Sequence, residues 1–135
     1  ADGRFTVMDD SYNASPASMK AALDVFQGLT GKRHIAVLAD MKELGGNYLA
    51  YHREVGEYAA NSGVDLVVTL GGACRSLAEG VRAVKEIPVV EFSDCGEMVK
   101  YLEAEIRDGD CVLFKGSNSM GLSAVADQFV EMAGR

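Results

Sequence analysis

Short apolar runs alternate with amphipathic stretches along the chain. The apolar runs are four or five residues long and nearly continuous, which is typical of strands buried on both faces of a parallel sheet. In the stretches between them, apolar side chains recur every three or four residues, and this spacing predicts helices. The strands are expected at residues 4–8, 34–38, 66–70, 89–92 and 111–114. The alternation predicts an α/β fold with an open, mostly parallel sheet and helices on both of its faces.

Turn and capping residues indicate where the helices begin and end. Ser15 followed by Pro16 predicts the start of the first helix, because serine caps helices and proline suits the first helical position. Gly63 is expected to cap the end of the second helix. Asp94, with an acidic residue three positions later, is similar to a capping box and predicts the start of the fourth helix. The last helix is expected to follow the loop 115–119, with Leu122, Val125, Ala126, Phe129 and Val130 on one face.

Length and charge limit the classes of protein that fit. The chain has 135 residues, the size of one domain. Its formal net charge of −7 argues against nucleic acid or an anionic membrane as a partner, because both require a basic surface. No apolar run approaches the roughly 18 residues of a membrane span, so a cytoplasmic protein is expected. The three cysteines are widely spaced and are expected to be free, buried side chains.

Three loops that follow predicted strands carry polar side chains suited to ligand binding: 9–15, 40–47 and 115–119. In a parallel sheet all of them lie at one edge, where α/β proteins bind ligands. Asp9 and Asp10 are adjacent, so in an extended chain they point to opposite faces and only one is expected to face the ligand. A carboxylate there suits the hydroxyls of a ribose, although it equally suits a helix N-terminus without any ligand.

The loop 115–119 has the residue types of an anion site. Gly116 allows the backbone to approach a ligand closely, and the Lys115 ammonium together with N–H groups at the start of the following helix would attract an anion. The alternative is a solvent-facing lysine beside a tight turn.

Several well-known site motifs are absent from the sequence. The dinucleotide pattern G-x-G-x-x-G and the P-loop pattern G-x-x-x-x-G-K-[ST] do not occur, so the chain lacks the usual phosphate cradle for ATP. Neither His34 nor His52 stands in a metal-binding spacing such as H-E-x-x-H. No Ser/His/Asp or Cys/His arrangement is present. We therefore expect neither a catalytic nucleophile nor a metal site in this chain.

A phosphoacceptor receiver domain is one alternative, because such domains have an acidic pair after the first strand and a lysine after the fifth. In those domains the phosphorylated aspartate follows the third strand. Here Leu70 and Gly71 occupy that position, and Gly116 stands where the receiver pattern has proline after the lysine. A free-standing module of Rossmann-like fold that binds a small molecule is a second alternative.

Four segments resemble motifs of the Mur ligase family. Residues 9–19 resemble D-D-S-Y-N-A-N-P-x-S-M, in the wording of the branch that adds D-alanyl-D-alanine to UDP-N-acetylmuramoyl-tripeptide. Residues 37–45 resemble V-L-G-D-M-x-E-L-G, and residues 52–56 resemble the H-x-x-V-G that follows it. Residues 112–117 resemble V-L-V-K-G-S. The resemblance covers essentially the whole chain in the correct order.

The resemblance implies that the chain is a single Rossmann-like domain, the C-terminal one of a three-domain ligase whose N-terminal and central ATP-binding domains are absent here. The intact enzyme would use ATP and Mg²⁺ to form an acyl phosphate on the tripeptide, which D-alanyl-D-alanine then attacks in peptidoglycan precursor synthesis. This domain would close over the other two, contacting the nucleotide ribose and the amino substrate. Alone it is expected to be inactive and to bind no cofactor tightly.

The resemblance also assigns residues to roles. It implies nucleotide contacts for Asp10 and Asn13. It implies substrate contacts for six residues: Ser11, Tyr12, Asp40, Lys115, Gly116 and Ser117. Three positions depart from the family pattern: Ser15 replaces the usual asparagine, Ala39 replaces glycine, and Asn118 stands where many relatives have arginine.

Overall fold

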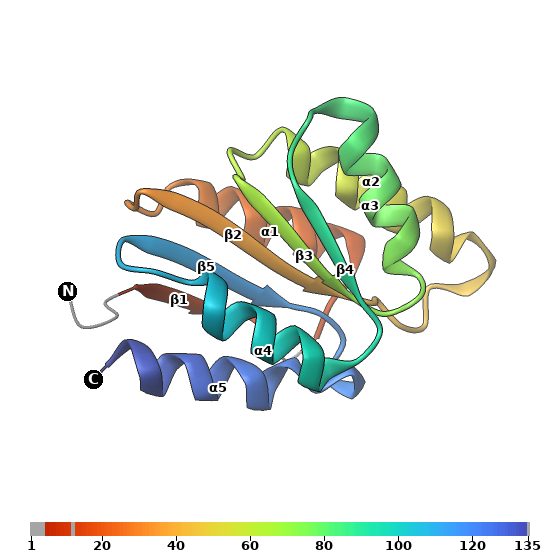
Figure 1. The fold of residues 1–135 in the computed structure, drawn as a ribbon. Helices are drawn as coiled ribbons and strands as arrows, with labels where there is room; N and C mark the ends of the chain where they lie inside the picture. Colours follow the sequence, from red (N-terminus) through yellow and green to blue (C-terminus); the bar gives the residue numbers. More distant parts are fainter. Residues whose placement is uncertain (1–4, 12, 135) are drawn as a thin grey trace.

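The computed structural model describes residues 5–11 and 13–134 of the chain (Figure 1). Strands and helices alternate through these residues, and a short 3₁₀ helix precedes each of α2 and α5. The strands are β1 (Thr6–Asp9), β2 (Arg33–Ala39), β3 (Leu66–Leu70), β4 (Val89–Phe92) and β5 (Asp110–Lys115). The helices are α1 (Pro16–Gln27), η1 (Gly45–Asn47), α2 (Tyr48–Ala60), α3 (Cys74–Val84), α4 (Cys95–Glu105), η2 (Asn118–Met120) and α5 (Leu122–Ala133).

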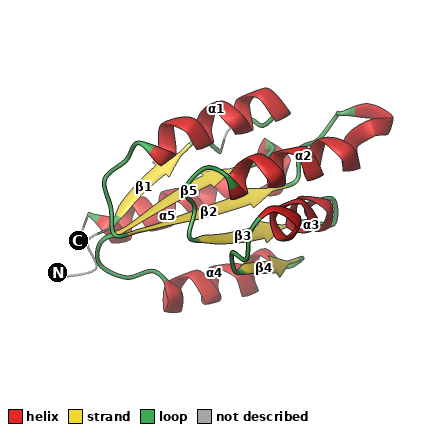
Figure 2. Ribbon diagram, turned by 90° about the horizontal axis from the view of Figure 1, so that it is seen from above, coloured by secondary structure: helices red, strands yellow, loops and turns green. Residues whose placement is uncertain are grey.

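The strands form one sheet in the order β1-β5-β2-β3-β4, and every neighbouring pair is parallel (Figure 2). The last strand, β5, therefore lies between the first two. In its register, Val37 of β2 is opposite Phe114 of β5, and Asp9 of β1 is opposite the same residue on the other side. The expected α/β fold with an open parallel sheet is confirmed.

Both faces of the sheet are buried, as the continuous apolar runs predict. Ala36 and Leu38 of β2 pack with α1, α2 and α3 on one face, while Ile35 and Val37 pack with α4 and α5 on the other. In Figure 1, α1 lies behind the sheet, α4 lies in front of it, and α5 runs below β1. The central strands β2 and β5 thus anchor two separate cores, which fixes their carboxyl ends as a rigid base for the loops.

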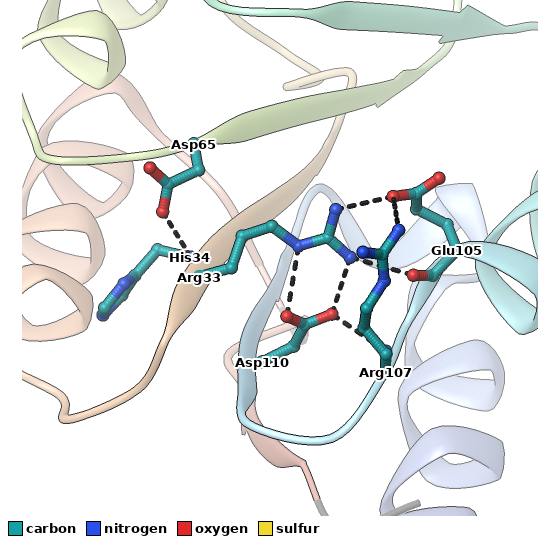
Figure 3. Close-up of polar contacts among 6 residues, drawn as sticks. All are labelled: Arg33, His34, Asp65, Glu105, Arg107 and Asp110. Carbon is teal, nitrogen blue, oxygen red and sulfur yellow. Dashed lines mark hydrogen bonds and ion pairs between the residues drawn. The ribbon is translucent and has the colours of Figure 1, made fainter.

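An ion-pair network secures the amino ends of β2 and β5 (Figure 3). Arg33 Nε and Nη2 donate to the two oxygens of the buried Asp110 carboxylate, at 3.1 and 2.8 Å. Its Nη1 and Nη2 also bond Glu105 at the end of α4, at 2.6 Å to Oε2 and 2.8 Å to the carbonyl oxygen. These hydrogen bonds, most of all those that Arg33 donates to Asp110, raise the pKa of Arg33. The network lies at the edge opposite to the predicted site and so acts on stability.

Some local predictions are confirmed and others are wrong. Ser15 caps α1, and Asp94 caps α4 by accepting from the Glu97 N–H at 2.9 Å. Gly63 does not cap α2; Asn61 is the C-cap, and Gly63 forms a left-handed turn (φ 71°) before β3. The last helix follows the loop 115–119 as predicted: it begins at Leu122, and η2 lies between it and β5.

The cysteines are free, and two of the three are buried as expected. Among the described residues, none of the helices is both long and apolar enough to pass through a bilayer.

Candidate functional site

The three polar loops singled out in the sequence follow neighbouring strands. Because β5 lies between β1 and β2, the loops that begin at Asp10, Gly116 and Asp40 meet at one edge of the sheet. The helices that follow β1 and β2 pack on one face of the sheet, whereas the helix that follows β5 packs on the other face. The loops after neighbouring strands therefore separate toward opposite faces at this point. In open α/β sheets this is where ligands bind. The predicted convergence of the loops is confirmed.

Lys115 joins the loop after β1 to the end of β5. Its Nζ lies 3.0 Å from Asp10 Oδ2 and donates to the carbonyl oxygens of Asp10 and Asn13, at 3.3 and 2.9 Å. The Lys115 side chain is only 2% exposed, whereas the Asp10 side chain is 47% exposed. The lysine is therefore inside the protein, and the carboxylate is the group that faces outward.

The loop between β1 and α1 is held by local hydrogen bonds as well. Asp9 accepts from both the backbone N–H and the hydroxyl of Ser11, which buries Ser11. The two adjacent carboxylates thus have different partners, Asp9 within the loop and Asp10 across to β5. Ser15 ends the loop by accepting from the Ser18 N–H at 3.1 Å, so serine performs the capping that the usual asparagine could also perform. Asn13 remains exposed beside Asp10.

The loop after β5 is tied to the loop after β2. The Ser117 N–H donates to the Asp40 carbonyl oxygen at 3.1 Å, and the Ser117 hydroxyl accepts from the Lys42 N–H at 2.7 Å. Gly116 lies against Ala39, too close for any side chain between them. Both residues are buried, so in this arrangement they shape the edge. The N–H groups of α5 begin beyond η2, so they do not add to an anion site at Lys115.

Asp40 is buried and caps α3. Its two carboxylate oxygens accept from the Cys74 N–H at 2.9 Å and the Ala73 N–H at 3.3 Å. The same carboxylate closes around Gly71, whose φ of 119° favours glycine and where a Cβ would fall about 2.4 Å from Asp40. A negative charge at a helix N-terminus is favourable, so this arrangement accounts for the aspartate by itself.

Asp40, His52 and Cys74 form the one group of potential metal ligands among the described residues. The chemistry of the group does not fit a metal. His52 Nδ1 donates to the Tyr48 carbonyl oxygen at 2.6 Å, and Nε2 accepts from the Met41 N–H at 2.9 Å, so both ring nitrogens are in use. Burial, followed by the Asp40 carboxylate, raises the pKa of Cys74 well above its usual range, which keeps the thiol protonated. The cluster is a structural support for the loop after β2.

A hollow of about 350 Å³ lies beside this support. It is lined by Asp40, Met41, Lys42, Glu43, Leu44, Gly45, Tyr48 and Ala73. Glu43 has a φ of 60°, in the left-handed region that residues other than glycine rarely adopt. Strained backbone of this kind gathers at binding sites. Lys42 and Glu43 were not among the residues predicted to bind a ligand, although they lie inside the sequence match at 37–45.

The predicted site residues thus divide into two sets. Asp10 and Asn13 are open to the surface at the edge, while Ser11, Asp40, Lys115, Gly116 and Ser117 are buried and hold the loops together. Tyr12, which was also predicted to contact substrate, lies outside the described residues.

Comparison with known proteins gives consistent matches. The sequence profile described as "Mur ligase, glutamate ligase domain" matches residues 1–118. The UDP-N-acetylmuramoyl-tripeptide–D-alanyl-D-alanine ligase of Mycobacterium leprae is 37% identical over 96% of this chain, and that of Bacillus subtilis is 31% identical over 96%. The chain spans only 28% and 29% of these two relatives.

Solved structures match in the same way. The MurF ligase from Thermotoga maritima in complex with ADP superimposes with a TM-score of 0.72 at 26% identity, covering 96% of this chain and 28% of that one. The UDP-N-acetylmuramoylalanyl-D-glutamyl-2,6-diaminopimelate–D-alanyl-D-alanyl ligase from Acinetobacter baumannii gives a TM-score of 0.78 at 26% identity, covering 94% and 27%. Sequence and fold therefore lead to the same set of proteins.

Proposed function

This chain belongs to the Mur ligase family, and on that premise we propose that it is the C-terminal domain of an enzyme that joins D-alanyl-D-alanine to UDP-N-acetylmuramoyl-tripeptide. The whole enzyme would have two further domains, an N-terminal one for the UDP-sugar and a central one with the P-loop. It would act in the cytoplasm during peptidoglycan precursor synthesis. The two D-alanyl-D-alanine ligases compared above are each more than three times as long as the part of them that matches this chain.

One observation carries the proposal. The segments that resemble the motifs of the D-alanyl-D-alanine-adding branch, 9–19, 37–45 and 112–117, meet at a single edge of the sheet. Segments that only resembled the family by chance would have no reason to gather at the edge where α/β proteins bind ligands.

The reaction would proceed through an acyl phosphate. A carboxylate oxygen of the tripeptide attacks the γ-phosphorus of ATP, and ADP leaves. The amine of D-alanyl-D-alanine would then attack the acyl carbon; the C–O bond to phosphate breaks, phosphate leaves, and the nitrogen loses a proton as the amide forms. Mg²⁺, held by the rest of the enzyme, would neutralise the phosphate charges. In the chain itself, the donor set at Asp40, His52 and Cys74 does not fit a metal, as described above.

This domain would contribute positioning and the exclusion of water rather than a nucleophile. Asp10 and Asn13, which are open at the edge, are proposed to contact the nucleotide, with the Asp10 carboxylate accepting from ribose hydroxyls. The part of the site that receives the amino substrate is proposed to be formed by Ser11, Tyr12, Asp40, Gly116 and Ser117. The buried members of this set would act by fixing the backbone of their loops.

The activity can be measured directly in the full-length protein that contains this chain. With ATP, Mg²⁺ and UDP-N-acetylmuramoyl-tripeptide, we expect phosphate release that depends on D-alanyl-D-alanine, and a product whose mass is that of the joined substrates. The 135-residue chain alone serves as the control, and it should give no product because its sequence has no P-loop. Absence of product from the full-length protein, with all substrates present, would refute the proposal.

A further inference from the structure

Lys115 has an unusual environment for a lysine at the end of a strand. Lysines are almost never fully buried unless they are paired, because removing the charge from water is costly. The Lys115 side chain is 2% exposed, and its ammonium meets one carboxylate oxygen and two carbonyl oxygens, all from the loop after β1. An ammonium has three N–H donors. Its donors are therefore accounted for by residues of this chain.

Lys42 provides the contrast at the same edge. Its side chain is 50% exposed, its nearest acidic oxygen is Asp40 Oδ2 at 4.0 Å, and it lines the hollow beside α3. A lysine that binds an anionic substrate group would resemble Lys42 in being reachable. Lys115 is instead enclosed, and it could reach a ligand only by giving up its bonds to Asp10 and Asn13.

We propose that Lys115 is a positioning residue that holds Asp10 and the backbone of Asn13 in the arrangement that presents the Asp10 carboxylate to the nucleotide, and that it does not contact the amino substrate. Two of its three bonds go to backbone carbonyls, so they hold the backbone at Asp10 and at Asn13 whatever the side chains there are. The third orients the carboxylate itself. Lys115 would thus influence the binding of ATP indirectly, by orienting Asp10. This assignment rests on the proposed function and changes the role that the sequence resemblance implied for Lys115.

Chemical labelling tests the enclosure without any need for turnover. The full-length protein is acetylated with a limiting dose of an amine-reactive ester, and the modified lysines are quantified by mass spectrometry after digestion. Lys115 should react at least tenfold more slowly than Lys42, and adding D-alanyl-D-alanine should leave its rate unchanged. Labelling of Lys115 at the rate of Lys42, with protection by D-alanyl-D-alanine, would overturn the proposal.

Kinetics of the full-length ligase test the route of the effect. Lys115→Met keeps the length and apolar stem of the side chain but removes the ammonium. We expect the KM for ATP to rise roughly tenfold or more, from the loss of charged hydrogen bonds that order the loop, while the KM for D-alanyl-D-alanine stays within about twofold. Lys115→Arg keeps a cation that can donate to the same carbonyls, so its KM for ATP should lie between those of Lys115→Met and the unmodified enzyme. Lys100→Met, on the exposed side of α4, is the surface control.

The outcomes separate the two claims. A variant that is merely less stable would lose kcat without a selective change in one KM. A selective rise in the KM for D-alanyl-D-alanine, with that for ATP unchanged, would show that Lys115 contacts the amino substrate and would overturn this inference. If the unmodified full-length protein has no ligase activity, the proposed function fails, and the labelling result still decides whether Lys115 is enclosed.

Discussion

Gly116 and Ala39 approach each other so closely that a Cβ built on Gly116 would lie 2.5 Å from the Ala39 Cβ. Real carbon atoms that are not bonded do not come this near, so the position admits only glycine while Ala39 is present. The contact joins the carboxyl ends of β5 and β2, directly beneath the hydrogen bonds between Ser117 and the loop after β2. Ala39 is one of the departures from the family pattern, and the extra methyl group fills the space that Gly116 leaves.

Gly116→Ala should therefore destabilise the fold by about 1–3 kcal/mol, as overpacking of a tight core does. Urea denaturation would measure the change in the free energy of unfolding. Adding Ala39→Gly to the same chain should recover part of the loss, because it removes one of the two colliding methyl groups. Gly46→Ala is the control, since a Cβ there meets nothing within 4 Å. Equal stability of Gly116→Ala and the unmodified chain would show that the close approach is wrong.

Removing Arg33, at the opposite edge of the sheet, should lower the free energy of unfolding much more than removing the exposed Arg82. Arg33→Ala leaves the buried Asp110 carboxylate without its cation and should lower the free energy of unfolding by about 2–3 kcal/mol. Arg82→Ala removes an ion pair to Glu91 whose side chains are 49% and 37% exposed, and this should cost roughly 0–1 kcal/mol. Thermal or urea melts of both variants would check the contrast. Similar losses for the two arginines would contradict it.

The cysteines should differ in reactivity toward a thiol reagent. Burial raises the pKa of both Cys74 and Cys111, so at pH 8 these thiols stay protonated and are shielded as well. Cys95 is partly exposed at the start of α4. A disulfide reagent whose released thiolate absorbs light should react rapidly with about one thiol in the folded chain and with all three in denaturant. Rapid reaction of Cys74 in the folded chain would contradict this, because it would show that the cluster of Asp40, His52 and Cys74 is accessible to the reagent.

Strand positions could be predicted because the apolar runs in this chain reflect burial on both faces, which is a local property of each segment. The order of the strands could not, since hydrophobic periodicity carries no information about which strands are neighbours. Placement of β5 between β1 and β2 brings Lys115 beside Asp10, although they are 105 positions apart in the sequence.

The roles of individual site residues were harder to predict for the same reason. Lys115 was expected to take part in an anion site because of the chemistry of its loop, and the family resemblance implied a substrate contact for Asp40. Their partners here are backbone groups from distant segments, namely the carbonyls of Asp10 and Asn13 and the N–H groups of Ala73 and Cys74. Such partners leave no pattern in the residue types. Ser15, by contrast, was correctly predicted as a cap because all of its contacts are local.

The role of Asp10 is tested most directly by kcat/KM for ATP in the proposed ligase reaction, measured on the full-length protein carrying Asp10→Ala. If Asp10 presents its outward carboxylate to the ribose, the loss of hydrogen bonds to a charged acceptor is worth about 1.5–3 kcal/mol, and kcat/KM for ATP should fall roughly 10- to 150-fold. The KM for D-alanyl-D-alanine should change little. Kinetics with ATP that match those of the unmodified enzyme would contradict the account, because the edge where the three loops meet would then not be the nucleotide site.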